Sequence, residues 1–193
     1  MKNLKIIALS LLLWSCGNNS NKENNEPHEQ HEETPATTNI ETLKDVDAAI
    51  SSQFNQMVEH YIHLKNGMVA SNSIEAKAGA KGMLDAIATI DTLKLTTEQK
   101  PVFNVQIVKI KEDVNHIIEN NDIEHQRGHL NSLSKSIYNL IKSFGSEKTL
   151  YYEFCPMANN NNGGHWISEI EEIKNPYFGD EMLNCGETKE TIK

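Results

Sequence analysis

Two cysteine–methionine pairs near the C-terminus are the residues whose types and spacing could do chemistry. Cys155 precedes Met157 by two positions, and Met182 precedes Cys185 by three. Thiolate and thioether sulfur select soft cations such as Cu(I), whereas hard cations prefer oxygen ligands. The sequence has no Cys-x-x-Cys pair, so it does not indicate a zinc ribbon or a thioredoxin-like redox site.

A disulfide between Cys155 and Cys185 is the alternative to a metal site. Cysteines outside the cytoplasm commonly pair, and on the chain-entropy model closing this loop would stabilise the fold by about 3–4 kcal/mol. A bridged pair offers no thiolate to a metal ion. The residues alone leave both alternatives open.

Two histidines form a second, weaker metal-binding pattern. His125 and His129 are four residues apart, so on a helix they share one face and could bind a metal ion together. The alternative is a solvated pair at the start of a helix. The sequence has no Gly-x-Ser-x-Gly, P-loop or His-Glu-x-x-His motif and no carboxylate pairing typical of acid–base catalysis, so we expect no enzymatic activity.

The first sixteen residues predict a targeting signal rather than part of the fold. Lys2 and Lys5 precede an apolar run at residues 6–13, and Leu-Trp-Ser precedes Cys16. This pattern resembles a bacterial lipoprotein signal, which implies that residues 1–15 are removed and that Cys16 is lipidated. The predicted product is extracytoplasmic and anchored by lipid to a bacterial membrane, on the periplasmic side of the outer membrane.

Composition narrows the partners and the organisation of the remaining chain. Among 193 residues, 27 are acidic and 18 are basic, a formal net charge of −9. Such a surface repels phosphate backbones, so nucleic acid is not an expected partner. Residues 16–40 are polar and rich in Asn and Glu. We expect a disordered tether there, because these residues cannot bury enough apolar surface to offset the entropy of ordering.

Residues 41–193 are predicted to form one domain that begins with helices. Apolar residues recur at three- and four-residue steps in four stretches, separated by short polar breaks near residues 72, 97 and 121. Small residues at positions 76–82 would let a neighbouring helix approach closely. Amphipathic helices with short breaks predict an all-α fold, an antiparallel four-helix up-down bundle.

The last part of this domain, residues 148–193, has a different composition. Residues 150–154 are apolar and aromatic over the length of a strand, and residues 159–164 and 175–179 are rich in turn-forming Asn, Pro and Gly. We expect an ordered but mostly irregular cap that carries the cysteines and methionines and folds onto the bundle.

Four short motifs in this cap resemble those of one known family. They are Cys-Pro-Met-Ala at residues 155–158, Gly-His-Trp-Ile-Ser at 164–168, Asn-Pro-Tyr-Phe-Gly at 175–179 and Met-Leu-x-Cys-Gly at 182–186. Their order and spacing resemble domain of unknown function 3347, an uncharacterised family widespread in Bacteroidetes. A similar domain is appended to periplasmic adaptor subunits of copper/silver efflux pumps. The resemblance covers most of residues 54–192.

The resemblance implies a soft-metal-binding accessory protein linked to heavy-metal efflux. The implied ligands of Cu(I) or Ag(I) are Cys155, Met157, Met182 and Cys185. Weaker candidates are His129, His125 and His165. Trp166 either shields a cation with its ring face or simply packs. Copper would be bound without being required for the fold, and an efflux adaptor protein would be the partner besides the membrane.

The alternative to metal binding is that the protein is a non-catalytic structural or protein-interaction module, in which Cys155 and Cys185 form a disulfide.

Overall fold

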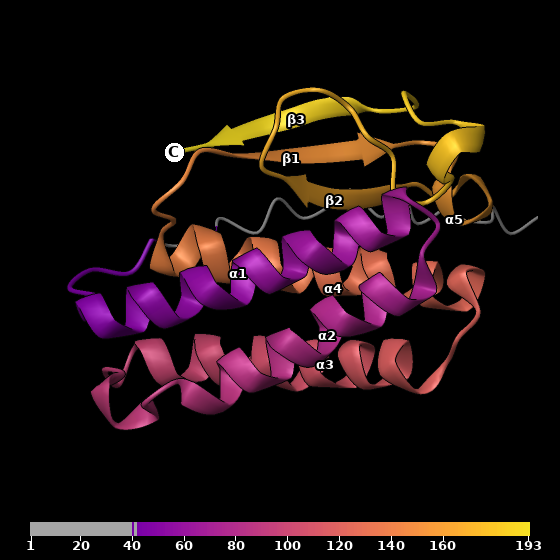
Figure 1. Cartoon of the computed structure of the whole chain (residues 1–193). Coiled ribbons are helices and arrows are strands. Elements are labelled where there is room, and N and C mark those ends of the chain that lie inside the picture. The colour runs from indigo at the N-terminus through magenta and orange to yellow at the C-terminus, as the bar shows by residue number, and fades with distance from the viewer. Residues whose placement is uncertain (1–39, 41) are drawn as a thin grey trace, which may run out of the picture. The chain divides into compact units, whose positions relative to one another are not determined.

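The computed structural model describes residue 40 and residues 42–193, and this part of the chain is mostly helical (Figure 1). Four long helices come first: α1 (Ala48–Val69), α2 (Ser73–Thr89), α3 (Gln99–Glu119) and α4 (Ile123–Phe144). A three-stranded antiparallel sheet follows, made of β1 (Leu150–Cys155), β2 (Gly164–Ser168) and β3 (Glu187–Ile192). Three short helical turns complete the fold: η1 (Thr92–Lys94), α5 (Ala158–Asn161) and η2 (Gly179–Glu181).

The prediction of four long helices is confirmed, whereas the prediction of an all-α fold with a mostly irregular cap is wrong. The cap contains a hydrogen-bonded sheet in the order β2–β1–β3. Of its strands, β1 has the apolar, aromatic sequence that predicts a strand. β3 reads Glu-Thr-Lys-Glu-Thr-Ile and is mostly exposed, so its sequence carries no buried strand pattern.

Several predictions about the N-terminal segment lie outside the described residues. These are the signal peptide at residues 1–15, the lipidation site Cys16 and, except for residue 40, the tether at residues 16–40. Among the helices that the structure does describe, none combines the length and the apolar character needed to cross a membrane.

Side-chain caps determine where the long helices begin. Asp47, Asn72 and Asp122 each accept hydrogen bonds from backbone N–H groups in the first turns of α1, α2 and α4. Before α3, the Gln99 N–H donates to Thr96 Oγ1 (3.3 Å) while the Thr96 N–H donates to Gln99 Oε1 (3.0 Å), a reciprocal capping box. These bonds satisfy N–H groups that a helix leaves unpaired at its start.

α1 and α2 pack closely because glycines lie at their contact. A Cβ atom added at Gly79 would lie 2.3 Å from the Leu64 nitrogen, and one added at Gly67 would lie 2.5 Å from the Ala76 nitrogen. A side chain at either position would collide with the backbone of the other helix. The close approach predicted from the small residues at positions 76–82 is confirmed.

The helices share one hydrophobic core, in which aromatic rings link three of them. Phe54 of α1 contacts Phe103 of α3, with ring centroids 5.8 Å apart, and Phe144 of α4, with ring centroids 4.5 Å apart. All three rings are at most 5% exposed. Large buried aromatic surfaces of this kind contribute strongly to the hydrophobic stabilisation of a small domain.

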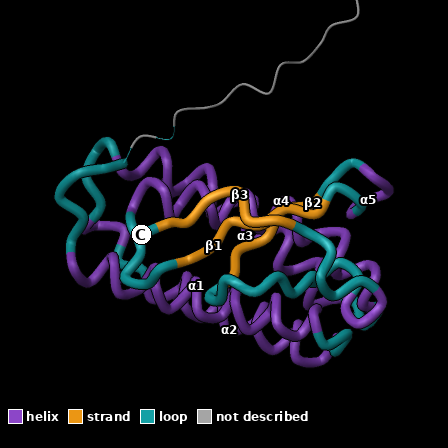
Figure 2. The backbone as a smooth tube through the Cα atoms, turned by 90° about the horizontal axis from the view of Figure 1, so that it is seen from above, coloured by secondary structure: helices purple, strands orange, loops and turns teal. Residues whose placement is uncertain are grey.

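The sheet lies over α1 and α4, as Figures 1 and 2 show from two directions. Trp166 and Ile167 of β2 are fully buried, on opposite faces of the sheet. The Tyr61 hydroxyl accepts a hydrogen bond from the Ile167 N–H (3.1 Å) and contacts Ser134 Oγ (2.7 Å), which itself donates to the Leu130 carbonyl (2.6 Å). One buried hydroxyl therefore joins α1, α4 and β2.

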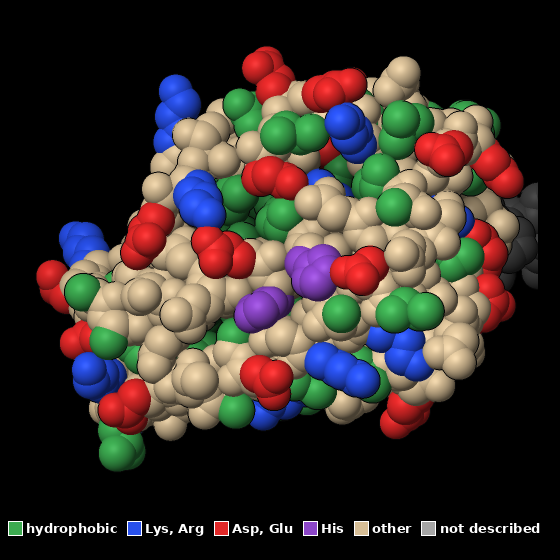
Figure 3. All heavy atoms as spheres, viewed as in Figure 1, with side chains coloured by type: hydrophobic (Ala, Val, Ile, Leu, Met, Phe, Trp, Pro, Cys, Tyr) green, Lys and Arg blue, Asp and Glu red, His purple; other side chains and the backbone are tan. Residues whose placement is uncertain are grey.

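The face of the domain that is turned toward the viewer in Figure 1, where α1 and α2 lie in front, carries charged side chains of both signs. Figure 3 shows acidic and basic side chains interspersed over it, with apolar side chains between them. An interspersed pattern produces no extended field of a single sign on this face.

Replacing Tyr61 with Phe is expected to lower the free energy of unfolding by about 1–3 kcal/mol, because the buried Ile167 N–H loses its acceptor. Urea denaturation measures this loss. Tyr138→Phe is the matched control, since the Tyr138 hydroxyl donates to Glu190 Oε2 (2.6 Å) at a partly exposed site where water can replace it. Equal losses in the two variants would contradict the assignment of Tyr61 as the junction between sheet and helices.

Candidate functional site

The structure brings the two predicted cysteines into contact. Cys155 ends β1 and is fully buried, and Cys185 lies in the turn before β3 and is half-buried. Their Sγ atoms are 2.7 Å apart. Pairing of β1 with β3 places the two segments side by side, and the Asn175 side chain donates to the Cys185 carbonyl (2.6 Å) and fixes the turn.

The structure leaves both cysteines unbonded, and their sulfur separation is closer to the about 2.05 Å of a disulfide bond than to that of two thiolates on one metal ion. Metal–thiolate bonds are about 2.3 Å long, so two sulfurs on one tetrahedral ion lie about 3.8 Å apart. The contact with the Cys155 thiol and, to a lesser extent, partial burial raise the pKa of the Cys185 thiol to about 11. The reduced Cys185 thiol therefore holds its proton at neutral pH and is a poor thiolate ligand.

The two predicted methionine ligands lie in different surroundings from the thiols. Met157 is 46% exposed and borders a surface hollow with Arg127 and Phe178. Met182 follows η2 directly and is half-buried, with its backbone carbonyl accepting from the Cys185 N–H (3.0 Å). Of the four predicted sulfur ligands, the contacts of the structure bring together the two thiols.

The hollow beside Met157 has a volume of about 450 Å³. Three consecutive asparagines on its rim, at positions 159, 160 and 161, have φ angles of 52°, 57° and 66°. Left-handed backbone is costly for residues other than glycine, and asparagine tolerates it best. The Asn159 side chain donates to the Gly163 carbonyl (2.9 Å) and the Asn162 side chain donates to the Asn159 carbonyl (2.9 Å), so the rim is held in place.

Arg127 lines this hollow and forms hydrogen bonds with several segments at this end of the molecule. Its guanidinium donates to the Pro176 carbonyl (2.8 Å), to the Met68 carbonyl (2.9 Å) and to Ser71 Oγ (2.9 Å), and it pairs with Glu124. These partners come from the C-terminal segment, the end of α1, the α1–α2 turn and α4. Arg127 is therefore a structural anchor whose hydrogen bonds are taken up inside the protein.

Trp166 and His165 occupy packed positions in the sheet. Trp166 is fully buried against Tyr177, with ring centroids 6.1 Å apart, and its shielding of a cation remains a prediction. The His165 ring stacks on Tyr152 (4.7 Å, interplanar angle 7°), and burial lowers the pKa of His165 to about 4. The imidazole is therefore neutral at physiological pH.

The predicted pair His125 and His129 is part of a larger group. His116 of α3 lies against His129, and one nitrogen of each of the three rings lies within 4.8 Å of the others. His129 Nδ1 is 3.2 Å from Asp113 Oδ1. Sequence reasoning missed His116 and Asp113 because they lie on a different helix, although their spacing of three residues places both on one face of α3.

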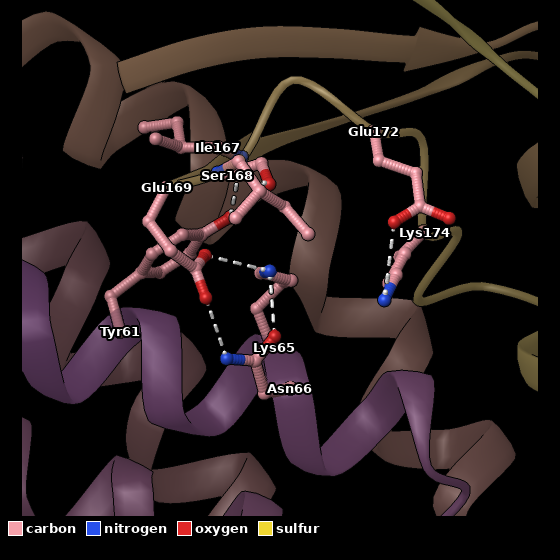
Figure 4. A network of polar contacts seen from close by, with 9 residues as sticks. Tyr61, Lys65, Asn66, Ile167, Ser168, Glu169, Glu172 and Lys174 are labelled. Carbon is pink, nitrogen blue, oxygen red and sulfur yellow. Dashed lines mark hydrogen bonds and ion pairs between the residues drawn. The ribbon is translucent and has the colours of Figure 1, made fainter. Parts of the chain in front are cut away.

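An ion pair between buried Lys65 and exposed Glu169 lies where the sheet meets α1. Figure 4 shows the Glu169 carboxylate directed at Lys65 and Asn66. Lys65 Nζ donates to Glu169 Oε2 (3.0 Å) and to Asn66 Oδ1 (2.7 Å), and Asn66 Nδ2 donates to Glu169 Oε1 (2.9 Å). Lys65 is only 1% exposed, so burial lowers its pKa while the charge of Glu169 opposes that shift. The buried Lys65 ammonium is thus satisfied by two side chains at the surface.

Glu153 of β1 is a buried acid, and sequence reasoning missed it as a candidate. It is fully buried, and neither carboxylate oxygen has a hydrogen-bond partner among the described residues. Burial raises its pKa to about 8, against a smaller lowering by the charge of Lys65. The available signal was a single acidic residue within an otherwise apolar strand.

The fold and this site define a mostly helical domain that is closed at its C-terminus by a small sheet and a contacting cysteine pair. Residues 57–149 match the model of a family described as a protein of unknown function (DUF3347). This match supports the uncharacterised-domain family that the C-terminal motifs resemble. The matched segment ends before β1, so those motifs lie outside it. No curated protein and no solved structure matches the chain.

The buried acid predicts a pH dependence of stability. The folded protein holds the Glu153 proton up to about pH 8, whereas the usual pKa is 4.5. The free energy of unfolding should therefore fall as pH rises from about 4.5 to 8, because the folded state binds this proton more tightly than the unfolded state. Glu153→Gln should remove this decline, as measured by urea denaturation across that range.

Glu190→Gln is the control for this pH dependence. Although burial opposes it, the hydrogen bonds from Lys142 and Tyr138 hold the pKa of Glu190 below its usual value. Its contribution to stability is therefore lost as pH falls, the opposite direction, and Glu190→Gln should keep the decline between pH 4.5 and 8. A Glu153→Gln profile parallel to that of the parent would contradict the prediction.

Proposed function

We propose that this protein is a lipid-anchored, extracytoplasmic and non-catalytic accessory module in which a Cys155–Cys185 disulfide closes the C-terminal sheet. The observation that carries the proposal is the contact between the two Sγ atoms, 2.7 Å apart. The lipoprotein-like signal ahead of Cys16 supports the location, where cysteines commonly pair. The module rests on an antiparallel four-helix up-down bundle formed by α1–α4.

A disulfide at this position would hold the whole sheet on the helices. The segment between the two cysteines contains α5, β2 and η2. Within this segment, β2 carries Trp166 and Ile167, both fully buried. A bond between Cys155 and Cys185 closes both ends of this segment and limits how far it can open in the unfolded chain.

We place the partner-binding surface of this module at the hollow beside residues 159–161. Its rim is a left-handed asparagine run held by its own hydrogen bonds, and Met157 is exposed next to it. Backbone in sparsely populated regions clusters at binding sites, where the surrounding structure maintains it. An exposed thioether is an adaptable apolar contact for a protein partner.

Soft-metal binding is the second candidate function. The observation in its favour is again the pairing of two thiols, together with the resemblance to domains of copper/silver efflux adaptors. In the reduced protein, Cys155 and Cys185 would separate and bind Cu(I) or Ag(I), with Met157 and Met182 as further ligands. The ion would then pass to an efflux adaptor by ligand exchange.

A thiol count distinguishes the two candidates. The full chain with Cys16→Ser, purified without reductant, is expected to show no free thiol. Reduction should then lower its free energy of unfolding by about 3–4 kcal/mol. The control is the Cys155→Ala, Cys185→Ala double variant, whose stability should not respond to reductant. Two free thiols in the native protein would contradict the disulfide.

Anaerobic Cu(I) titration against a competing chelator tests the second candidate on the reduced protein. If the candidate is correct, the reduced protein binds one Cu(I) ion and the Cys155→Ser, Cys185→Ser double variant loses that binding. Met157→Leu and Met182→Leu should each weaken it. The candidate fails if the double serine variant binds Cu(I) as tightly as the parent.

A further inference from the structure

Three histidine rings meet where α3 ends and α4 begins. His116 lies in the last turn of α3, His125 in the first turn of α4, and His129 one turn further along α4. The His116 and His129 rings are stacked, with centroids 4.7 Å apart and an interplanar angle of 3°, and the His125 centroid is 5.2 Å from that of His129. One nitrogen from each ring lies within 4.8 Å of the other two.

Asp113 fixes the tautomer of the His129 ring, which is the most buried of the three. Its Oδ1 atom is 3.2 Å from His129 Nδ1. An ionised carboxylate only accepts hydrogen bonds, so this contact places the ring proton on Nδ1. The lone pair of His129 is then on Nε2 and available to a metal ion. A carboxylate behind a ligating histidine is the usual arrangement in protein metal sites.

A second observation points to a missing positive charge at the same place. Asp113 is 7% exposed, and its Oδ2 atom has no hydrogen-bond partner within the part of the chain that the structure describes. A buried carboxylate that makes a single hydrogen bond is costly unless a positive charge lies nearby. A cation bound to His129 would supply that charge through the ring.

The donor set identifies the class of ion. Three imidazole nitrogens suit borderline divalent ions such as Zn²⁺ and Cu²⁺, whereas the thiols and thioethers near the sheet suit softer ions. Nitrogens on one tetrahedral Zn²⁺ lie about 3.3 Å apart. His116 and His125 are exposed, so their rings can rotate to reach this separation while Asp113 holds His129.

We propose that His116, His125 and His129 bind one divalent transition-metal ion, Zn²⁺ or Cu²⁺, with Asp113 as the residue that positions His129. Solvent occupies the remaining coordination position. This site shares no ligand with the cysteine pair and does not depend on the redox state of that pair. Evidence against the proposed function would therefore not count against this site, and the reverse also holds.

Zn²⁺ titration of the metal-stripped full chain, with a chromophoric chelator as competitor, tests the site. The parent is expected to bind one Zn²⁺ ion at this site. His116→Gln, His125→Gln and His129→Gln should each weaken that binding by at least about tenfold, because each removes one of three protein ligands. One equivalent of Cu²⁺ should give an electron paramagnetic resonance spectrum with nitrogen ligation, reduced in the same three variants.

Two double variants serve as matched controls. His60→Gln with His63→Gln removes a histidine pair spaced three residues apart on α1, and His28→Gln with His31→Gln removes the histidines of the N-terminal segment. Neither should change the affinity of the site. The proposal is overturned if the parent shows no saturable Zn²⁺ binding, or if either control double variant loses as much affinity as the three cluster variants.

Asp113→Asn separates positioning from packing. It keeps the shape of the side chain but removes its charge, and it should lower Zn²⁺ affinity by about 10- to 100-fold. In the metal-free parent, ¹⁵N NMR of the His129 ring should show the proton on Nδ1, and this preference should weaken in the variant. A parent ring with the proton on Nε2 would overturn the role assigned to Asp113.

Discussion

A single-layer sheet must bury its apolar surface against another element, and the packing of this sheet on α1 and α4 is the constraint on which the rest of the structure depends. Burial carries the polar backbone of β2 away from water, and the Tyr61 hydroxyl replaces that water for the Ile167 N–H. Lys65 and Glu153 are also removed from water where the sheet packs on the helices. Lys65 keeps its partners Glu169 and Asn66. Glu153 has no hydrogen-bond partner among the described residues, and burial raises its pKa to about 8, so it retains its proton at neutral pH. The shifted acid–base properties of the domain thus follow from where the sheet sits.

The helical part of the fold could be predicted because its information is local. Apolar steps of three and four residues mark each helix, and glycines such as Gly79 mark the α1–α2 contact. The sheet could not be predicted as a whole. β1 has an apolar run, but its two neighbours are chosen by pairing over long stretches of chain: Phe154 pairs with His165 on one side and with Glu187 on the other. No local pattern in β3 reveals that choice.

The same distinction explains what sequence reasoning found of the candidate sites. His125 and His129 lie four apart on one helix, so their shared face could be read directly. His116 and Asp113 join them only through the packing of α3 against α4, which the sequence does not state. The sequence pairs Cys155 with Cys185 as candidates for a bond or a metal site, and the contact between their sulfurs comes from the tertiary structure. Chemistry that spans two elements depends on tertiary structure.

The outer strand of the sheet has a consequence for how copies of this protein behave together. β3 leaves one side of its backbone without a strand neighbour, since the sheet order is β2–β1–β3. An open strand edge invites a second molecule to add to it. β3 carries the exposed charged side chains of Glu187 and Lys189, and charges on an edge strand make edge-to-edge pairing unfavourable. For a protein concentrated on a membrane surface, as proposed here, this charged margin would keep crowded neighbours from polymerising through their sheets.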